Sequence, residues 1–146
     1  MSTVIPFKNL TDVPWTHTAT LTFDSKALNA IKSNRIDEPA RLAYIDFIRQ
    51  AAIKLHLRIA AASVVTWDDE RPHIHLLLVG KSKNGKTLND CSKTTLEGIW
   101  KHGNAVVLPT HDIEGAVGYL KKNFEQGGTD FNISGAQMLK RWLCNA

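Results

Sequence analysis

Two histidines with a single residue between them are the first candidates for chemistry in this chain. His73 and His75 lie in the segment RPHIHLLLV, residues 71–79, which is rich in β-favouring residues. If the segment is a strand, alternate side chains leave the same face, so both imidazoles lie together and Ile74 points to the other face. Imidazole is a good ligand for divalent cations. The spacing therefore predicts that one metal ion can contact both rings.

A tyrosine on a later segment is the second candidate. In HDIEGAVGYLKKNFEQ, residues 111–126, the pattern is that of an amphipathic helix capped by Asp112. Tyr119 lies away from the apolar stripe and shares its face with Lys122 and Asn123, three and four residues on. The simple alternative is a surface tyrosine beside solvated lysines. Tyr44, by contrast, falls within a long apolar helix and is predicted to be a core residue.

The elements that must position these residues alternate between strands and helices. Residues 16–23 (THTATLTF) alternate strictly, with His17 on the apolar face and threonines on the other. A short polar segment, 68–71, forces an antiparallel hairpin between its two flanking strands. The predicted strands are 16–23, 58–67, 73–79 and 105–108, and the predicted helices are 39–56, 93–100, 112–126 and 134–143. The order predicts an α+β fold, an antiparallel sheet of about five strands with helices packed on its faces.

Composition restricts the class of protein further. The chain has 146 residues, of which 43% are hydrophobic and 22% charged, the balance of one globular domain over residues 1–146. No apolar run is long enough for a membrane span and no signal peptide is evident, so a soluble, cytoplasmic protein without membrane partners is expected. Two distant cysteines indicate neither a disulfide framework nor a zinc cluster. The net charge of +4 is compatible with an anionic partner.

In their order, these motifs resemble the single-tyrosine HUH endonucleases, the rolling-circle replication initiators (Rep) and their relatives. TLTF at 20–23 resembles the first strand motif of that family, RPHIHLLLV at 71–79 its metal motif, and VGYLKK at 117–122 its tyrosine motif. WKHGNAVVLP at 100–109 is similar to the strand that precedes the catalytic helix. The resemblance covers about residues 16–126 and implies a Rep-like sandwich related to RNA-recognition domains.

The resemblance also implies a reaction. His73 and His75 would hold Mg²⁺ or Mn²⁺ against the scissile phosphate of single-stranded DNA, Tyr119 would attack, and Lys122 would help the phenol to lose its proton. The product would be a 5′-phosphotyrosine with a free 3′-hydroxyl. Many relatives add a carboxylate ligand from the preceding strand, but the corresponding residues here are Val64 and Val65. Asp68 and Asn123 both remain candidates for the third ligand.

The implied substrate is single-stranded DNA at an origin hairpin of a plasmid or virus in a prokaryotic host. Arg71, Lys81, Lys83 and Lys121 are the candidates for phosphate contacts. Trp67 and Trp100 could stack on bases, although a tryptophan at a strand end or beside a short helix more often packs in the core. No Walker motif is present, so a host helicase or polymerase is the expected partner. Two alternatives remain open: a single-strand DNA transposase of the same superfamily, and a non-catalytic nucleic-acid-binding module on the same scaffold. The oligomeric state is not predicted.

Overall fold

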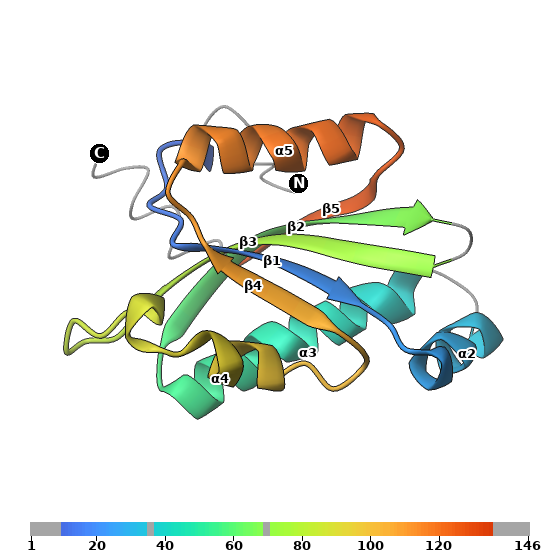
Figure 1. Cartoon of the computed structure of the whole chain (residues 1–146), viewed down its shortest axis with the longest axis horizontal. Coiled ribbons are helices and arrows are strands. Elements are labelled where there is room, and N and C mark those ends of the chain that lie inside the picture. Colours follow the sequence, from blue (N-terminus) through green and yellow to red (C-terminus); the bar gives the residue numbers. More distant parts are fainter. Residues whose placement is uncertain (1–9, 35–36, 69–70, 136–146) are drawn as a thin grey trace.

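The computed structural model describes residues 10–34, 37–68 and 71–135, which form an open five-stranded sheet with helices on both faces (Figure 1). The spatial order of the strands is β4-β1-β3-β2-β5, and every neighbouring pair is antiparallel. The predicted α+β class and antiparallel sheet are confirmed. The strands are β1 (His17–Thr22), β2 (Arg58–Asp68), β3 (Arg71–Lys81), β4 (Ala105–Pro109) and β5 (Thr129–Ser134). The helices are α2 (Ser25–Asn34), α3 (Asp37–Leu55), α4 (Lys93–Gly98) and α5 (Ile113–Glu125), with a 3-10 turn, η1 (Leu88–Asp90).

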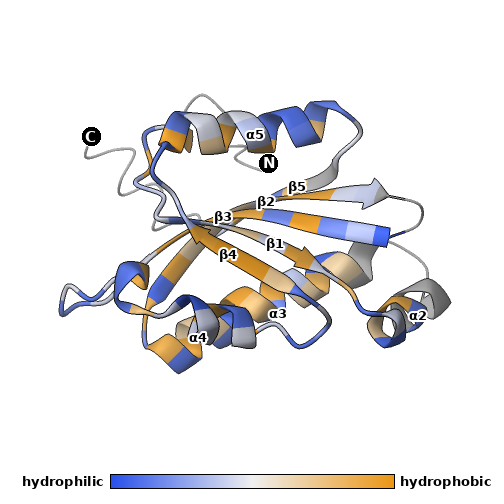
Figure 2. Ribbon diagram, viewed as in Figure 1, coloured by the Kyte–Doolittle hydropathy of each residue, from blue (hydrophilic) through white to orange (hydrophobic). Residues whose placement is uncertain are grey.

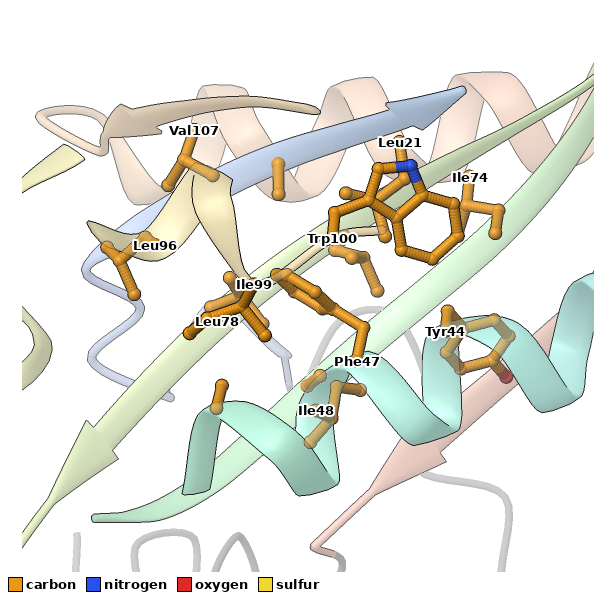
Figure 3. Close-up of a cluster of buried hydrophobic side chains, with 14 of the residues drawn as sticks. Leu21, Tyr44, Phe47, Ile48, Ile74, Leu78, Leu96, Ile99, Trp100 and Val107 are labelled. Carbon is orange, nitrogen blue, oxygen red and sulfur yellow. The ribbon is translucent and has the colours of Figure 1, made fainter. Parts of the chain in front are cut away.

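The two faces of the sheet carry separate hydrophobic cores. α3 and α4 cover one face and α5 covers the other (Figure 1). On the first face, Tyr44 and Phe47 of α3 pack with Trp100 beneath the sheet (Figure 3). Tyr44 is fully buried, as its place in an apolar helix predicts. On the second face, Val117 and Leu120 of α5 pack on residues of β2 and β3. Strand alternation supplies both cores, because successive side chains leave opposite faces.

Hydropathy along β3 changes from one end to the other. In Figure 2 the start of β3 is hydrophilic, whereas its later part is apolar like the neighbouring strands. The hydrophilic part begins with Arg71 and includes His73 and His75. Since the side chains of one face of β3 meet α5, the polar start of the strand creates a polar region beside an otherwise apolar helix contact.

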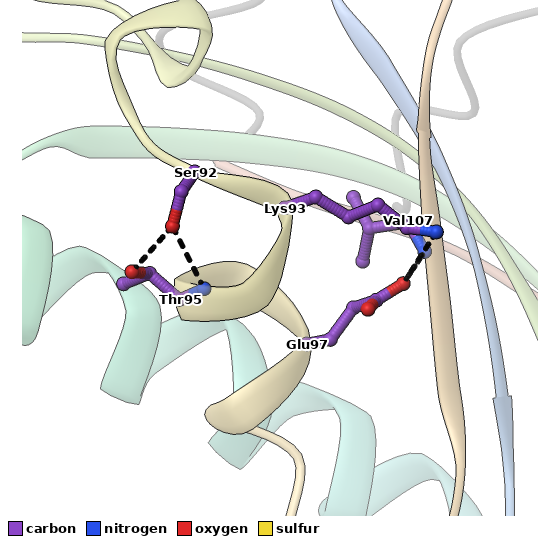
Figure 4. A network of polar contacts seen from close by, with 5 residues as sticks. All are labelled: Ser92, Lys93, Thr95, Glu97 and Val107. Atoms are coloured by element: carbon purple, nitrogen blue, oxygen red, sulfur yellow. Dashed lines mark hydrogen bonds and ion pairs between the residues drawn. The ribbon is translucent and has the colours of Figure 1, made fainter.

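The edge strand β4 is protected against pairing with other strands. Glu97 of α4 accepts a hydrogen bond from the backbone N–H of Val107 at 2.9 Å (Figure 4). Pro109, at the end of the strand, has no N–H to offer. α4 itself begins at Ser92, whose hydroxyl caps the backbone N–H of Thr95. A short edge with a proline and an occupied donor is a poor template for another strand.

Two elements differ from the sequence-based expectations. α2 and β5 were not predicted, and the helix expected over 134–143 begins at a residue, Ser134, that is in fact the last residue of β5. The remainder of that expected helix lies outside the described residues, except Gly135. Phe131 and Ile133 pack on the α5 side of the sheet, so β5 carries the alternation of a half-buried strand. In the described part of the chain, no helix has the length and apolar character needed to cross a membrane.

Candidate active site

β3 carries both histidines on the face of the sheet that α5 covers. In the β2–β3 register, His75 is paired with Val64 and His73 with Thr66. Val64 belongs to the core beneath α5, and directly paired residues share a face, so His75 points toward α5. His73 has the same parity along the strand. The expectation that the two imidazoles leave one face together is therefore confirmed.

His75 sits in a partly buried environment with one ring nitrogen bonded and the other not. Its Nε2 lies 2.9 Å from the hydroxyl Oγ1 of Thr66. Its Nδ1 is buried and has no hydrogen-bond partner within the described part of the chain. Burial lowers the pKa of His75 below its ordinary value of 6.5, and the charge of nearby His73 lowers it further. The ring is therefore held neutral, the form that can coordinate a metal.

Tyr119 meets this imidazole from the opposite layer. The ring centroids of Tyr119 and His75 are 5.9 Å apart and the rings are nearly perpendicular, at 82°. This edge-to-face geometry is a favourable one for aromatic rings. Buried Val117 and Leu120 fix α5 on the sheet, while Tyr119 between them stays 59% exposed. The helix thus presents a solvent-accessible phenol beside a strand histidine that is distant in sequence.

The third metal ligand remains unassigned. Across residues 10–34, 37–68 and 71–135, no set of three His, Cys, Asp or Glu side chains is placed to hold one ion. Val64 pairs with His75 and is fully buried, so the position where the resemblance to HUH endonucleases predicts a carboxylate is apolar. Asn123, one turn beyond Tyr119, donates its Nδ2 to the Tyr119 carbonyl at 2.9 Å. Asp68 ends β2, and its side chain lies outside the described part.

The candidate phosphate-binding residues fall into two groups. Arg71 and Lys122 lie near the histidines, whereas Lys121, Lys81 and Lys83 lie on another side of α5 or farther along the chain. Arg71 starts β3 two positions before His73, and Lys122 follows Tyr119 at helical spacing i+3, so both belong to the region of the imidazoles. Lys121 lies two residues from Tyr119, on a different side of α5, and forms an ion pair with Glu125 at 3.8 Å.

The two lysines at the end of β3 are remote from the histidines. At about 3.3 Å per residue, Lys81 lies roughly 20 Å along the strand from His75. Lys83 follows in the loop beyond it. These two residues can therefore reach only parts of a bound strand that are distant from the histidines.

Other residues proposed from the sequence have clear structural places. Trp100 is 5% exposed and its indole Nε1 donates to the carbonyl of Thr22 at 2.8 Å, so it is a core residue that packs and does not offer its ring to a base. Trp67 is partly exposed near the end of β2. His17 is buried on the face of the sheet that α3 covers, so it lies on the opposite side from His75.

Sequence reasoning did not single out the threonines that surround the imidazoles. Thr20 and Thr22 of β1 are paired with His75 and His73, and Thr66 contacts His75 directly. The alternation in THTATLTF could have indicated Thr20 and Thr22, because a strand face made of threonines is expected to lie beside polar groups and not in the apolar core. Which strand that face would adjoin depends on sheet order, which the sequence does not state.

A scan against protein-family models found no model that matches this chain. Searches of curated proteins and of solved structures found no significant match either.

Proposed function

We propose that this protein is a metal-dependent endonuclease that nicks and rejoins single-stranded DNA through Tyr119, in the manner of the HUH superfamily. The observation that carries the proposal is the contact of the Tyr119 ring with His75, across the space between α5 and β3. The imidazoles of His73 and His75 and the exposed phenol of Tyr119 lie on the same side of the sheet, and these are the groups that such a reaction needs.

Tyr119 acts as the nucleophile in this proposal. Its hydroxyl oxygen attacks the scissile phosphorus and loses its proton, and the bond from phosphorus to the 3′-oxygen breaks. The strand then carries a 3′-hydroxyl, which has taken up a proton, while its 5′-phosphate is esterified to Tyr119. Lys122, one turn further along α5, stabilises the negative charge on the phenolic oxygen. Because one phosphodiester replaces another, the step is reversible without ATP.

His73 and His75 are the residues that would hold Mg²⁺ or Mn²⁺. The buried Nδ1 of His75 without a partner and the low basicity of that ring fit a metal ligand. When bound, the ion would polarise the phosphoryl group and offset charge in the transition state. Asp68, at the end of β2, and Asn123, which shares a face of α5 with Tyr119, both remain candidates for the third ligand.

Single-stranded DNA is the proposed substrate, with an origin hairpin of a plasmid or virus in a prokaryotic cytoplasm as its source. In this proposal Arg71, at the start of β3, and Lys122, one turn beyond Tyr119, would contact phosphates next to the cleaved bond. Lys81 and Lys83 would contact a more distant part of the DNA, and Lys121 a phosphate on the outer side of α5. A host helicase or polymerase would separate and copy the strands.

The test is the formation of a covalent protein–DNA adduct. Labelled single-stranded oligonucleotides are incubated with the protein and Mn²⁺, and adducts are resolved on denaturing gels. We expect an adduct with the wild type, none with Tyr119→Phe, and a strongly reduced yield with His75→Ala. Tyr44→Phe is the matched control, because it removes the chain's other phenol from a buried position. An adduct that persists in Tyr119→Phe would show that the nucleophile is wrong.

A further inference from the structure

We propose that Thr66 is a positioning residue that fixes the tautomer of His75, so that the proton resides on Nε2 and the lone pair of Nδ1 faces the metal ion. This inference rests on the proposed metal site, and it identifies the coordinating atom of one ligand and the residue that selects it. No sequence motif pointed to Thr66.

The geometry comes from the register of two strands. Thr66 is paired with His73, and His75 is its diagonal neighbour on the same face. This offset brings Thr66 Oγ1 to 2.9 Å from Nε2 of His75. Threonine is β-branched and restricted at χ1, so a strand holds its hydroxyl in few positions. The hydroxyl is therefore a firm partner for one specific ring nitrogen.

Only one of the two possible hydrogen-bond arrangements is compatible with a metal ligand. If the hydroxyl donates to Nε2, the proton of the neutral ring is on Nδ1, and a buried N–H is left without an acceptor. If Nε2–H donates to the hydroxyl oxygen, Nδ1 is a buried lone pair. Leaving a buried polar atom unsatisfied costs about 1–3 kcal/mol. A cation bound to Nδ1 would satisfy this atom only in the second arrangement, because only there does Nδ1 carry a free lone pair.

The same pattern recurs wherever histidine binds metals. A ligating imidazole almost always donates its second N–H to an oxygen atom, which fixes the tautomer and orients the ring. Thr66 would supply that oxygen here. Because Nδ1 is covered by protein atoms, an ion reaches it only after a neighbouring side chain turns away, and the exposed Tyr119 ring lies against this imidazole.

The experiment reads the tautomer directly, without DNA or metal. Histidine labelled with ¹⁵N is incorporated, and long-range ¹H–¹⁵N spectra are recorded at pH 8, where imidazoles are neutral. We expect His75 to be protonated on Nε2 in the wild type and in Thr66→Ser, which keeps the hydroxyl. We expect Thr66→Val, which keeps the β-branched shape, to weaken this preference and raise the fraction of rings protonated on Nδ1. A wild-type ring protonated on Nδ1 would overturn the proposal before any variant is made.

Metal affinity provides the second readout. Titration calorimetry with Mn²⁺ is expected to give a Kd about 10–100-fold weaker for Thr66→Val than for the wild type. Thr66→Ser should restore the affinity. An unchanged Kd in Thr66→Val would overturn the positioning role.

The experiments distinguish a failure of the Thr66 proposal from a failure of the proposed nicking activity. If wild type and variants behave as expected but no adduct forms on DNA, the nicking activity is refuted and Thr66 keeps its role. If the wild type forms the adduct yet binds Mn²⁺ with Nδ1 protonated, the role of Thr66 is refuted and the nicking activity stands. Absence of any Mn²⁺ binding by the wild type would overturn the positioning proposal.

Discussion

Gly128, in the turn between α5 and β5, controls how closely the end of α5 approaches the sheet. Its N–H donates to the carbonyl of Asn123 at 2.9 Å, which ends α5. A Cβ added at Gly128 would lie 2.4 Å from that oxygen, 2.7 Å from Cγ1 of Val64 and 2.8 Å from Cα of Phe124. Two of these three atoms are backbone, so no rotamer change can relieve them. The substitution Gly128→Ala must therefore displace the end of α5.

The size of the effect follows from two opposing contributions. Overpacking of a closely packed site costs about 1–3 kcal/mol. Replacing glycine by alanine also restricts the unfolded chain, which stabilises the fold by about 0.4–1 kcal/mol. The clash is the larger contribution because the Asn123 oxygen must retreat by about an ångström to reach an ordinary contact distance. We expect a net loss of about 1–2 kcal/mol in the free energy of unfolding.

Urea denaturation followed by far-UV circular dichroism measures this change. Gly118→Ala is the matched control, because it lies in the same helix with nothing within 4 Å of an added Cβ. There the gain in helix propensity predicts a stabilisation of up to about 1 kcal/mol. The two variants should thus shift the urea midpoint in opposite directions with similar m-values. A Gly128→Ala protein as stable as Gly118→Ala would refute the packing described here.

Three further predictions concern the elements that hold the sheet together. Trp100→Phe should lower the free energy of unfolding by about 1–3 kcal/mol, measured in urea, because the carbonyl of Thr22 loses its indole donor in a partly buried place. The hydrogen bond from the Val107 N–H lowers the pKa of Glu97 below its ordinary value of 4.5. The ionised carboxylate therefore stabilises the fold fully above pH 4.5, and this contribution is lost as the pH falls through the lowered pKa of the folded state. The advantage of wild type over Glu97→Ala in thermal melts should accordingly shrink on acidification. Burial lowers the pKa of His17 below 6.5, so wild type should lose stability relative to His17→Phe as the pH falls below that value; a constant difference between pH 8 and pH 5 would contradict this.

The fold class was predictable because it depends on local patterns. Alternation in THTATLTF, the helical spacing after Pro39 and the short polar turn at 68–71 gave the first strand, the long helix and the hairpin. The cap at Asp112 and the apolar spacing after it predicted a helix over 112–126, and the observed bounds of α5 differ from that by one residue at each end. Helix α2 and strand β5 were missed, since each depends on packing against elements that lie elsewhere in the chain.

The identity of the candidate residues was determined by the sequence alone, because residue types and strand parity require no tertiary information. That His73 and His75 share a face follows from a period of two. The 5.9 Å distance between the ring centroids of Tyr119 and His75 does not follow from the sequence. It depends on which face of the sheet α5 covers and on how deeply Val117 and Leu120 pack there. Tertiary structure likewise decided that Trp100 is core, that Lys81 is remote, and that Thr66 bonds His75. Contacts between residues distant in sequence are set by sheet order and register, and neither is written in any local pattern.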